Sequence, residues 1–259
     1  MIPIENHIAT LSKILFATSD VGGWVPTMQW LNMAASIESI NIDTIKHNDS
    51  FGWCSPSDDY DIARDAVLKE FTFNLTIFNF VWGALESCID IIKVPKHPNK
   101  QLRGKITNTC YYIGQIELSS SIPELIKQTT YFSELAEQCY GYDRVNKRIN
   151  RLNDFGISGV GLNAVYELRN KFAHGSLDFP EPGQNNEPDC IENNLVICAT
   201  RIVLLSMQVI LLRFYQHIDK YELYLRDNGF GLEGDWYLED ALRQCHQELE
   251  YDEERYALL

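Results

Sequence analysis

The sequence predicts an all-α protein, and three observations lead to that fold class. Apolar residues recur at steps of three and four from about residue 58 to residue 92, as they do on one face of a long helix. A second apolar stretch, at about 190–226, is long enough for another such helix. No convincing multi-strand pattern accompanies them. With 259 residues, of which 45% are apolar, the chain can bury one substantial core.

The elements follow in order along the chain. Residues 1–57 contain several turn signals and three tryptophans, and we assign this N-terminal extension no fold. The first long helix begins in "SPSDDYDIARD", where Ser, Pro and acidic residues stand together as they do at a helix start. Inside it, "FTFNLTI" alternates as a strand does, but the helical pattern is longer and is favoured.

Shorter helices are predicted beyond this point, at about 105–118, 123–140, 143–153 and 161–173, the last one after the glycine-bearing loop "FGISGVG". The second long helix covers about 190–226, and an acidic helical tail closes the chain. The expected organisation is therefore an N-terminal extension (1–57), a helical domain (58–227) and an acidic C-terminal helical tail (228–259).

Composition excludes several classes of protein. The formal net charge of −14 argues against a general nucleic-acid coating protein, which would present a basic surface. Seven scattered cysteines suggest neither a disulfide framework nor a zinc site, so a reducing cytoplasm is the expected location. The N-terminus has no secretory signal, and polar residues interrupt the apolar stretch 194–212. We therefore expect a buried helix there and no membrane span.

One short motif stands out, "ELRNKFAHG", which ends the helix at 161–173. Its plain interpretation is a helix end. A cation such as Lys171 or His174 interacts favourably with the negative end of the helix dipole, and Gly175 adopts the left-handed conformation without strain. The functional interpretation depends on where the motif stands, between the two long helices.

In that position the chain resembles a HEPN domain, most closely the Apea-like branch. The resemblance covers about residues 58–227 and depends on "FNFVWGALESCIDII" in the first long helix and on "YELRNKFAHG". The family signature is an arginine followed after four to six residues by a histidine, with a polar residue directly after the arginine. Arg169, Asn170 and His174 match those positions.

The resemblance implies a metal-independent endoribonuclease without a cofactor, dimeric as a rule and often a toxin or an anti-phage defence effector. Its partners would be an RNA substrate, a second copy of the chain and an inhibitory or defence-system protein. In one toxin branch a tyrosine stands two places after the histidine and is modified by a partner enzyme. Ser176 occupies that place here, which argues against such control.

The three matching residues suit this chemistry on separate grounds. RNA is cut without metal when its own 2′-hydroxyl attacks the adjacent phosphate, which requires a base, an acid and a positive charge. Histidine can serve in either proton role near neutral pH, and arginine binds phosphate oxygens through a planar fork of donors. His174 is therefore the candidate acid or base, Arg169 the phosphate ligand and Asn170 a supporting donor.

Helix geometry adds a condition, because positions five apart point about 140° away from each other. Arg169 and His174 converge only if His174 lies at the frayed helix end or beyond it. The motif also supplies a single histidine, so a homodimer with one composite site is expected. The alternative is a non-catalytic HEPN-like module that dimerises and binds a nucleotide or a partner protein.

The remaining candidates are less specific. Glu86 and Lys171 are possible supporting residues, although a carboxylate pair such as Glu86 and Asp90 is more often solvated. Two basic segments, "KHPNKQLRGK" and "RVNKRINR", supply candidate RNA-binding residues: Lys100, Arg103, Lys105, Arg144, Lys147, Arg148 and Arg151. The other histidines are isolated in sequence and are expected to be structural or exposed: His7, His47, His97, His217 and His246. No metal-ligand spacing is present, so no metal is expected.

Overall fold

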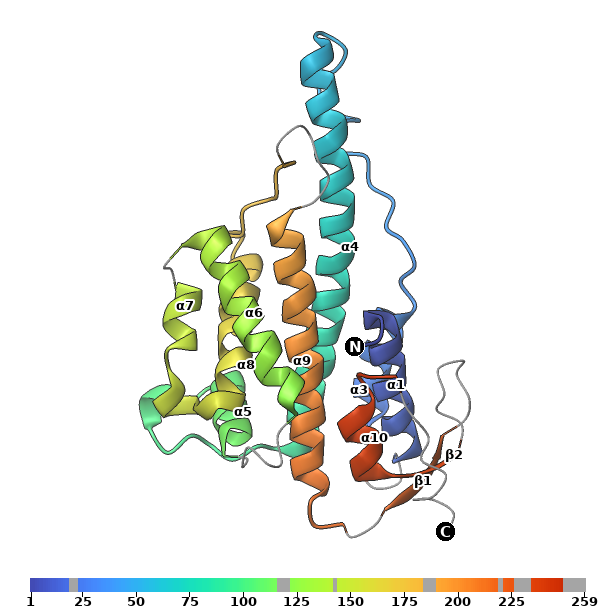
Figure 1. The fold of residues 1–259 in the computed structure, drawn as a ribbon, viewed down its shortest axis with the longest axis vertical. Helices are drawn as coiled ribbons and strands as arrows, with labels where there is room; N and C mark the ends of the chain where they lie inside the picture. Colours follow the sequence, from blue (N-terminus) through green and yellow to red (C-terminus); the bar gives the residue numbers. More distant parts are fainter. Residues whose placement is uncertain are drawn as a thin grey trace.

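The computed structural model describes residues 1–18, 23–115, 122–141, 144–183, 190–218, 221–225 and 234–248. It is mostly helical, which confirms the all-α prediction (Figure 1). The elements, in chain order, are α1 (Ile4–Ala17), α3 (Val25–Ala35), α4 (Ser55–Ile92), the 3-10 turn η1 (Lys100–Leu102), α5 (Lys105–Gly114), α6 (Pro123–Tyr140), α7 (Arg144–Ile149), α8 (Leu152–Ala173), α9 (Ile191–Tyr215), β1 (Glu222–Leu225), β2 (Gly234–Tyr237) and α10 (Leu238–Gln244).

The two long helices, α4 and α9, pack side by side and form the centre of the molecule (Figure 1). Most of α9 is buried, because α4, α6, α8 and α10 contact it from several sides. The residues of "FTFNLTI" lie in the middle of α4, as the longer pattern predicted. The first turns of α4 extend beyond the other helices at the top of Figure 1.

Helices α5, α6, α7 and α8 lie on one side of this central pair (Figure 1). The segment "FGISGVG" is not the predicted loop but part of α8, where only Gly156 has a non-helical backbone (φ 64°). Its glycines let neighbouring helices approach closely. A Cβ on Gly159 would lie 2.1 Å from the backbone oxygen of Cys110, and one on Gly114 would lie 1.6 Å from that of Phe155. These residues therefore set the spacing between α5 and α8.

Helices α1 and α3 of the N-terminal extension pack with β1 and the described part of the C-terminal tail on the other side of the central pair. We call α1, α3, β1, β2 and α10 the end module (Figure 1). Trp24 anchors it to the end of α9, because its indole N–H donates to the Tyr215 hydroxyl at 2.6 Å. Trp30 packs on Gly83 of α4, where a Cβ would lie 2.7 Å from the indole ring.

Two of the predicted boundaries are wrong. The second long helix ends at Tyr215, and part of its expected length is strand β1. Strand β1 pairs antiparallel with β2, with Leu223 opposite Trp236. The described part of the tail is helical only over α10, from Leu238 to Gln244. A four-residue strand is too short to produce an alternating pattern that a sequence would reveal.

Candidate functional site

The motif "ELRNKFAHG" forms the C-terminal end of α8, and its backbone makes a Schellman motif. The N–H of Gly175 donates to the oxygen of Phe172 at 3.0 Å, and the N–H of Ser176 donates to the oxygen of Lys171 at 2.8 Å. Gly175 has φ 64°, the left-handed conformation that this motif requires. The plain interpretation of the glycine as a helix stop therefore matches the geometry.

His174 occupies the C-cap position, and its backbone N–H still donates to the oxygen of Asn170 at 3.0 Å. It therefore lies on the helical path and not beyond it. Helical geometry then places Arg169 and His174 about 140° apart around the axis. We therefore expect the two side chains to leave α8 in different directions.

A different set of residues shares the His174 face of α8. Asn163, Glu167, Asn170 and His174 recur at steps of four, three and four, and they form one polar stripe along the helix. The first two are buried, Asn170 is half-buried and His174 is exposed. The stripe therefore runs from the interior to the surface and ends at the histidine.

Arg169, Asn170 and His174 are available for a ligand in the part of the chain that the structure describes. Their side chains make no hydrogen bond or ion pair with the described residues. Arg169 and Asn170 are half-buried, whereas His174 is exposed. Lys171, the supporting candidate, has its ammonium 3.7 Å from the centre of the Tyr140 ring. Lys171 thus helps to hold the end of α8 against the end of α6.

Arg148 of α7 binds the inner half of the polar stripe. Its Nε donates to Oε2 of Glu167 at 2.7 Å, and its NH1 donates to Oδ1 of Asn163 at 3.0 Å. Its guanidinium also lies over the ring of Tyr166, 5.4 Å from the ring centre. The opposing carboxylate is only 8% exposed, so this ion pair is largely screened from water. Arg148 was predicted from the sequence to be an RNA-binding candidate. In the structure its guanidinium is instead engaged with two side chains of α8.

Glu86 contacts neither Arg169 nor His174 through any hydrogen bond in the described structure. Its carboxylate accepts a hydrogen bond from the indole N–H of Trp82 at 2.7 Å. Trp82 in turn stacks on Tyr166 of α8, with the rings nearly parallel at 7°. Glu86 thus fixes an aromatic contact between α4 and α8, which is a structural role.

The other basic candidates divide into three groups. Some are engaged within the chain: Lys105 with Asp90 at 2.7 Å, Arg151 with Asp154 at 2.8 Å, and Arg103 with the backbone oxygen of His97 at 3.0 Å. Lys100 and Lys147 are exposed and make no ion pair with the described residues. The side chain of Arg144 lies outside the described residues. Among these candidates, Lys100 and Lys147 are therefore the described side chains that are available to bind a phosphate.

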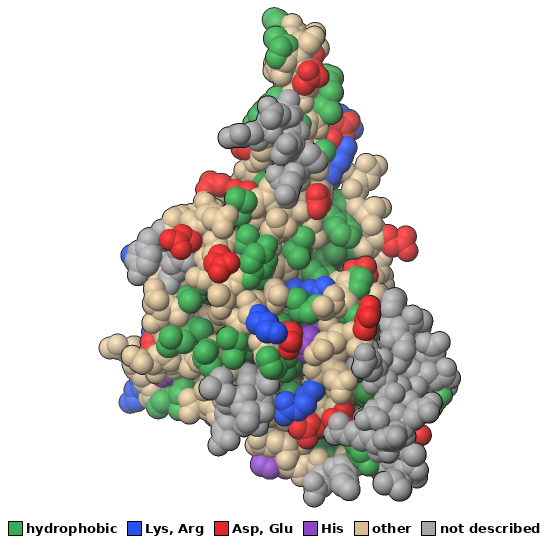
Figure 2. All heavy atoms as spheres, in the orientation of Figure 1, with side chains coloured by type: hydrophobic (Ala, Val, Ile, Leu, Met, Phe, Trp, Pro, Cys, Tyr) green, Lys and Arg blue, Asp and Glu red, His purple; other side chains and the backbone are tan. Residues whose placement is uncertain are grey.

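The first basic segment, residues 96–105, lies near the start of α8, whereas the motif lies at the C-terminal end of that helix. The ring of His97 is buried there, and its Nε2 lies 3.3 Å from the backbone oxygen of Asp154. Asp154 and Arg169 stand on the order of 20 Å apart at 1.5 Å per residue. On the face drawn in Figure 2, no large Lys and Arg patch appears among the described residues. An RNA bound at His174 would therefore need a long path to reach this segment.

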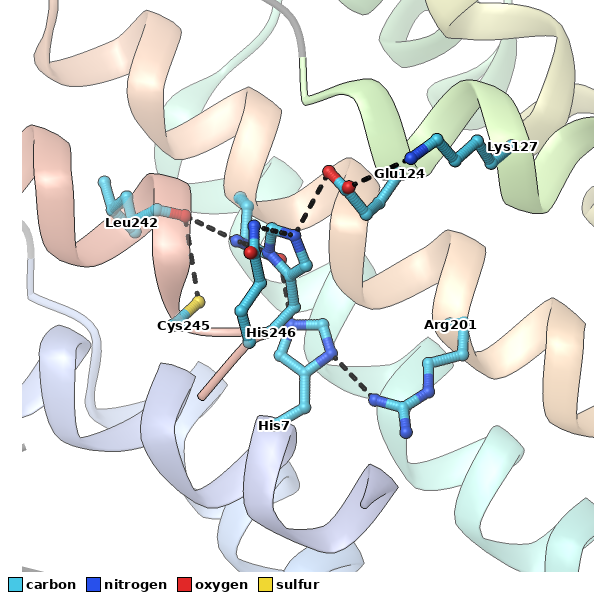
Figure 3. Close-up of polar contacts among 9 residues, drawn as sticks. His7, Glu124, Lys127, Arg201, Leu242, Cys245 and His246 are labelled. Carbon is cyan, nitrogen blue, oxygen red and sulfur yellow. Dashed lines mark hydrogen bonds and ion pairs between the residues drawn. The ribbon is translucent and has the colours of Figure 1, made fainter. Parts of the chain in front are cut away.

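The structure brings together one polar cluster that the sequence reasoning missed. His7 and His246, treated above as isolated, lie with their ring centres 6.0 Å apart, and both are fully buried (Figure 3). Gln208 lies between them, and Arg201 and Glu124 flank them. The only sequence signal was the pair of polar residues, Arg201 and Gln208, inside an otherwise apolar helix.

A pocket of about 570 Å³ opens beside this cluster, on the Glu124 side. Its lining is polar and carries both signs of charge, from Met1, Glu124, Lys127, Gln128, Gln247 and Glu248. No group of three or more His, Cys, Asp or Glu side chains suited to a metal ion occurs among the described residues. The pocket therefore offers hydrogen-bonding groups rather than a metal centre.

The cysteines of the interior are poor nucleophiles. Burial raises the pKa of the Cys88 thiol to about 12, and burial also raises the pKa values of Cys110 and Cys245. The thiolate is the reactive form, so these side chains behave as small apolar groups near neutral pH. These three positions therefore suggest no thiol chemistry.

Comparison with known proteins leaves the geometry as the guide to function. The chain matches no family model, no curated protein and no solved structure.

Among the described residues, α4 and α9 are long and apolar enough to cross a membrane. The apolar window of α9 is 89% buried, as in the core helix of a soluble protein, and that of α4 is 50% buried. Their length and composition are therefore weak evidence for a membrane span.

Proposed function

We propose that this chain is a cytoplasmic, metal-independent endoribonuclease of the HEPN type that acts as a homodimer, in the manner of a toxin or a defence effector. The observation that supports the proposal is the end of α8. There an exposed imidazole, His174, stands one helical turn after Asn170, and neither side chain has a partner among the described residues. A helix end alone does not require a polar stripe that ends in an exposed histidine.

The proposed reaction begins with the 2′-hydroxyl of the RNA, which loses its proton to a base and attacks the adjacent phosphorus. The bond from phosphorus to the 5′-oxygen breaks, an acid protonates that oxygen, and a 2′,3′-cyclic phosphate remains. His174 would carry a proton in one of these steps. Arg169 would bind the non-bridging oxygens, and Asn170 would donate to the phosphate or orient the imidazole.

The dimer in this proposal follows from the angle between Arg169 and His174. Because they point about 140° apart, a phosphate in front of His174 in one chain is poorly placed for the arginine of the same chain. A two-fold axis near the end of α8 would present Arg169 and His174 of a second copy to the same phosphate. It would also supply the second histidine that an acid–base pair needs.

The test uses purified protein with total RNA, in the presence and absence of EDTA. We expect cleavage to persist with the chelator, to leave 2′,3′-cyclic phosphate ends and to disappear in both Arg169→Ala and His174→Ala. Lys46→Ala is a suitable control, because that side chain is exposed, has no ion pair among the described residues and is not an RNA-binding candidate. Cleavage that needs a metal, or that survives loss of His174, would rule out this mechanism.

Subunit mixing tests the composite site. Wild-type protein and His174→Ala are unfolded together, refolded and assayed at several mixing ratios. If each site needs both histidines, activity should fall with the square of the wild-type fraction. A linear fall, or an active monomer, would exclude the shared site.

A non-catalytic binding module is the second candidate, and the Schellman motif favours it. That motif explains Gly175 and the C-cap position of His174 without any chemistry. The net charge of −14 also suits a protein partner better than RNA. In the assays above, this candidate predicts no cleavage by the wild-type protein at any metal concentration.

A further inference from the structure

The missed cluster is a continuous chain of polar contacts, which we call the buried relay: Arg201, His7, Gln208, His246 and Glu124 (Figure 3). NH1 of Arg201 lies 3.3 Å from Nδ1 of His7, and Nε2 of His7 lies 2.8 Å from Oε1 of Gln208. Nε2 of Gln208 lies 3.1 Å from Nδ1 of His246, whose own Nε2 lies 3.4 Å from Oε2 of Glu124. Each nitrogen of the two rings thus has a polar partner, and Nε2 of His246 has a second one, Nε2 of Gln247 at 3.0 Å.

These contacts define the protonation of His7 and, through the amide of Gln208, indicate that Nδ1 of His246 is an acceptor. Arginine has donors only, so Nδ1 of His7 must accept from Arg201 and carries no proton. His7 then donates from Nε2 to the oxygen of Gln208, which leaves the amide NH₂ of Gln208 to donate to Nδ1 of His246. Both histidines are therefore neutral in this arrangement. A proton on Nδ1 of His7 would set two donors and two positive charges against each other in the interior.

The relay holds α1 and the residues just after α10 on α9. Arg201 and Gln208 belong to α9, His7 to α1, and His246 follows α10. The backbone repeats the connection: a guanidinium N–H of Arg201 donates to the oxygen of Ile2, and the N–H of Ile2 donates to the oxygen of His246 at 3.1 Å. An N–H of Gln208 also donates to the backbone oxygen of Leu242 in α10. Loss of the relay therefore weakens the attachment of α1 and α10 together.

We propose that the buried relay is a proton-operated latch, which in mild acid releases α1 and α10 of the end module from α9. A proton taken up at Nδ1 of His7 removes the acceptor that Arg201 uses. A proton taken up at Nδ1 of His246 removes the acceptor that Gln208 uses. Both rings then repel Arg201, and the charged rings gain hydration when the end module separates from α9.

The charged groups around the rings support this direction. Arg201 and His246 face His7, and burial is the main cause that holds the pKa of His7 well below its ordinary value. His246 faces Glu124, the Met1 amino group and Arg201, and burial lowers its pKa as well. Glu124 favours the protonated ring, but Lys127 lies 3.5 Å from the same carboxylate and partly offsets it. Glu5 acts mainly on Arg201.

Opening of the latch would also remodel the adjacent pocket of about 570 Å³. Met1 and Gln247, which line it, belong to the two segments that the relay holds, whereas Glu124 and Gln128 belong to α6. Separation of the end module would therefore remove one wall of the pocket and uncover the apolar surface of α9.

Hydrogen exchange of the full chain at pH 7.5, 6.5 and 5.5 tests the latch, after correction for the intrinsic exchange rates. At pH 5.5, one unit below the ordinary histidine pKa, each neutral ring favours opening by up to about tenfold. Protection in residues 4–17 and 238–244 should therefore fall by about 10- to 100-fold between pH 7.5 and pH 5.5. Protection in residues 75–92 of α4 should stay constant over the same range.

The matched variant is His7→Gln, which keeps a donor for Gln208 and cannot take up a proton in this range. Its loss of protection in residues 4–17 should be about tenfold smaller than that of the wild type. Unchanged protection in wild-type α1, or an equal loss in α4, would overturn the proposal without any variant. An equal loss in His7→Gln and the wild type would overturn it as well.

Discussion

Substitution of His174 by alanine separates chemistry from structure at the end of α8. The three backbone hydrogen bonds there, from the N–H groups of His174, Gly175 and Ser176, do not involve the imidazole. The imidazole is exposed and forms no hydrogen bond with the described residues. His174→Ala should therefore cost less than about 1 kcal/mol, the upper end of the usual effect of a cation at an exposed helix C-terminus.

Gly175→Ala is the matched comparison, because it changes the backbone of the same turn. A Cβ on Gly175 would meet nothing within 4 Å, so the cost comes from the left-handed conformation alone (φ 64°). That cost is about 1–2 kcal/mol for a residue other than glycine. We expect Gly175→Ala to be the less stable of the two variants and to retain RNA cleavage at 25 °C.

Both variants are compared with the wild type by urea unfolding, followed by circular dichroism at pH 8, and by RNA cleavage in EDTA. The expected pattern is near wild-type stability without cleavage for His174→Ala, and reduced stability with cleavage for Gly175→Ala. A loss of more than about 2 kcal/mol in His174→Ala would refute the reasoning, because the ring would then have a structural role. Wild-type cleavage by a stable His174→Ala would refute the catalytic assignment.

Three further predictions concern packing and charge. Gly159→Ala should lower the free energy of unfolding by more than about 2 kcal/mol, measured in urea, because its Cβ would lie 2.1 Å from a backbone oxygen of α5. Arg148→Ala should cost about 2–3 kcal/mol in the same assay, since it removes the cation 2.7 Å from the nearly buried Glu167 carboxylate; a change below 0.5 kcal/mol would contradict this. Burial lowers the pKa values of His7 and His246, so below about pH 6.5 the unfolded chain binds protons that the folded chain does not. The free energy of unfolding should then fall as pH falls, by up to about 1.4 kcal/mol per pH unit and per histidine, and a flat profile between pH 6.5 and pH 5.5 would contradict it.

Long periodic segments were predictable from the sequence, and short ones were not. The apolar repeat at steps of three and four in α4 is longer than the seven-residue alternating segment inside that helix, so the helix was predictable. Helix α6 begins at Pro123, as expected. The loop predicted at "FGISGVG" was wrong because these glycines serve helix contacts, and a sequence does not show which neighbour approaches them. Strand β1 was missed because its four residues are too few to show an alternating pattern.

In the candidate site, only the features that depend on neighbouring residues were predictable from the sequence. The Schellman motif and the exposure of His174 follow from "AHG" at a helix end, and Gly175 is the signal. The pairing of Arg148 with Glu167 depends on how α7 packs on α8, which local patterns do not contain. The meeting of His7 with His246 is a property of tertiary structure, and no spacing rule leads to it.

The end module has a consequence for the order in which the chain folds during synthesis. His7 cannot form its contacts until Gln208, which is 201 residues further along, and His246 beyond it have been synthesised. At 5–20 residues per second, the ribosome needs about 10–40 s to make that stretch. Helices α1 and α3 therefore emerge well before α9 and α10, and His7 and Trp24 are without their α9 partners in the meantime. A chain that stops before α9 would leave these side chains without those partners, and such chains are natural clients for chaperones.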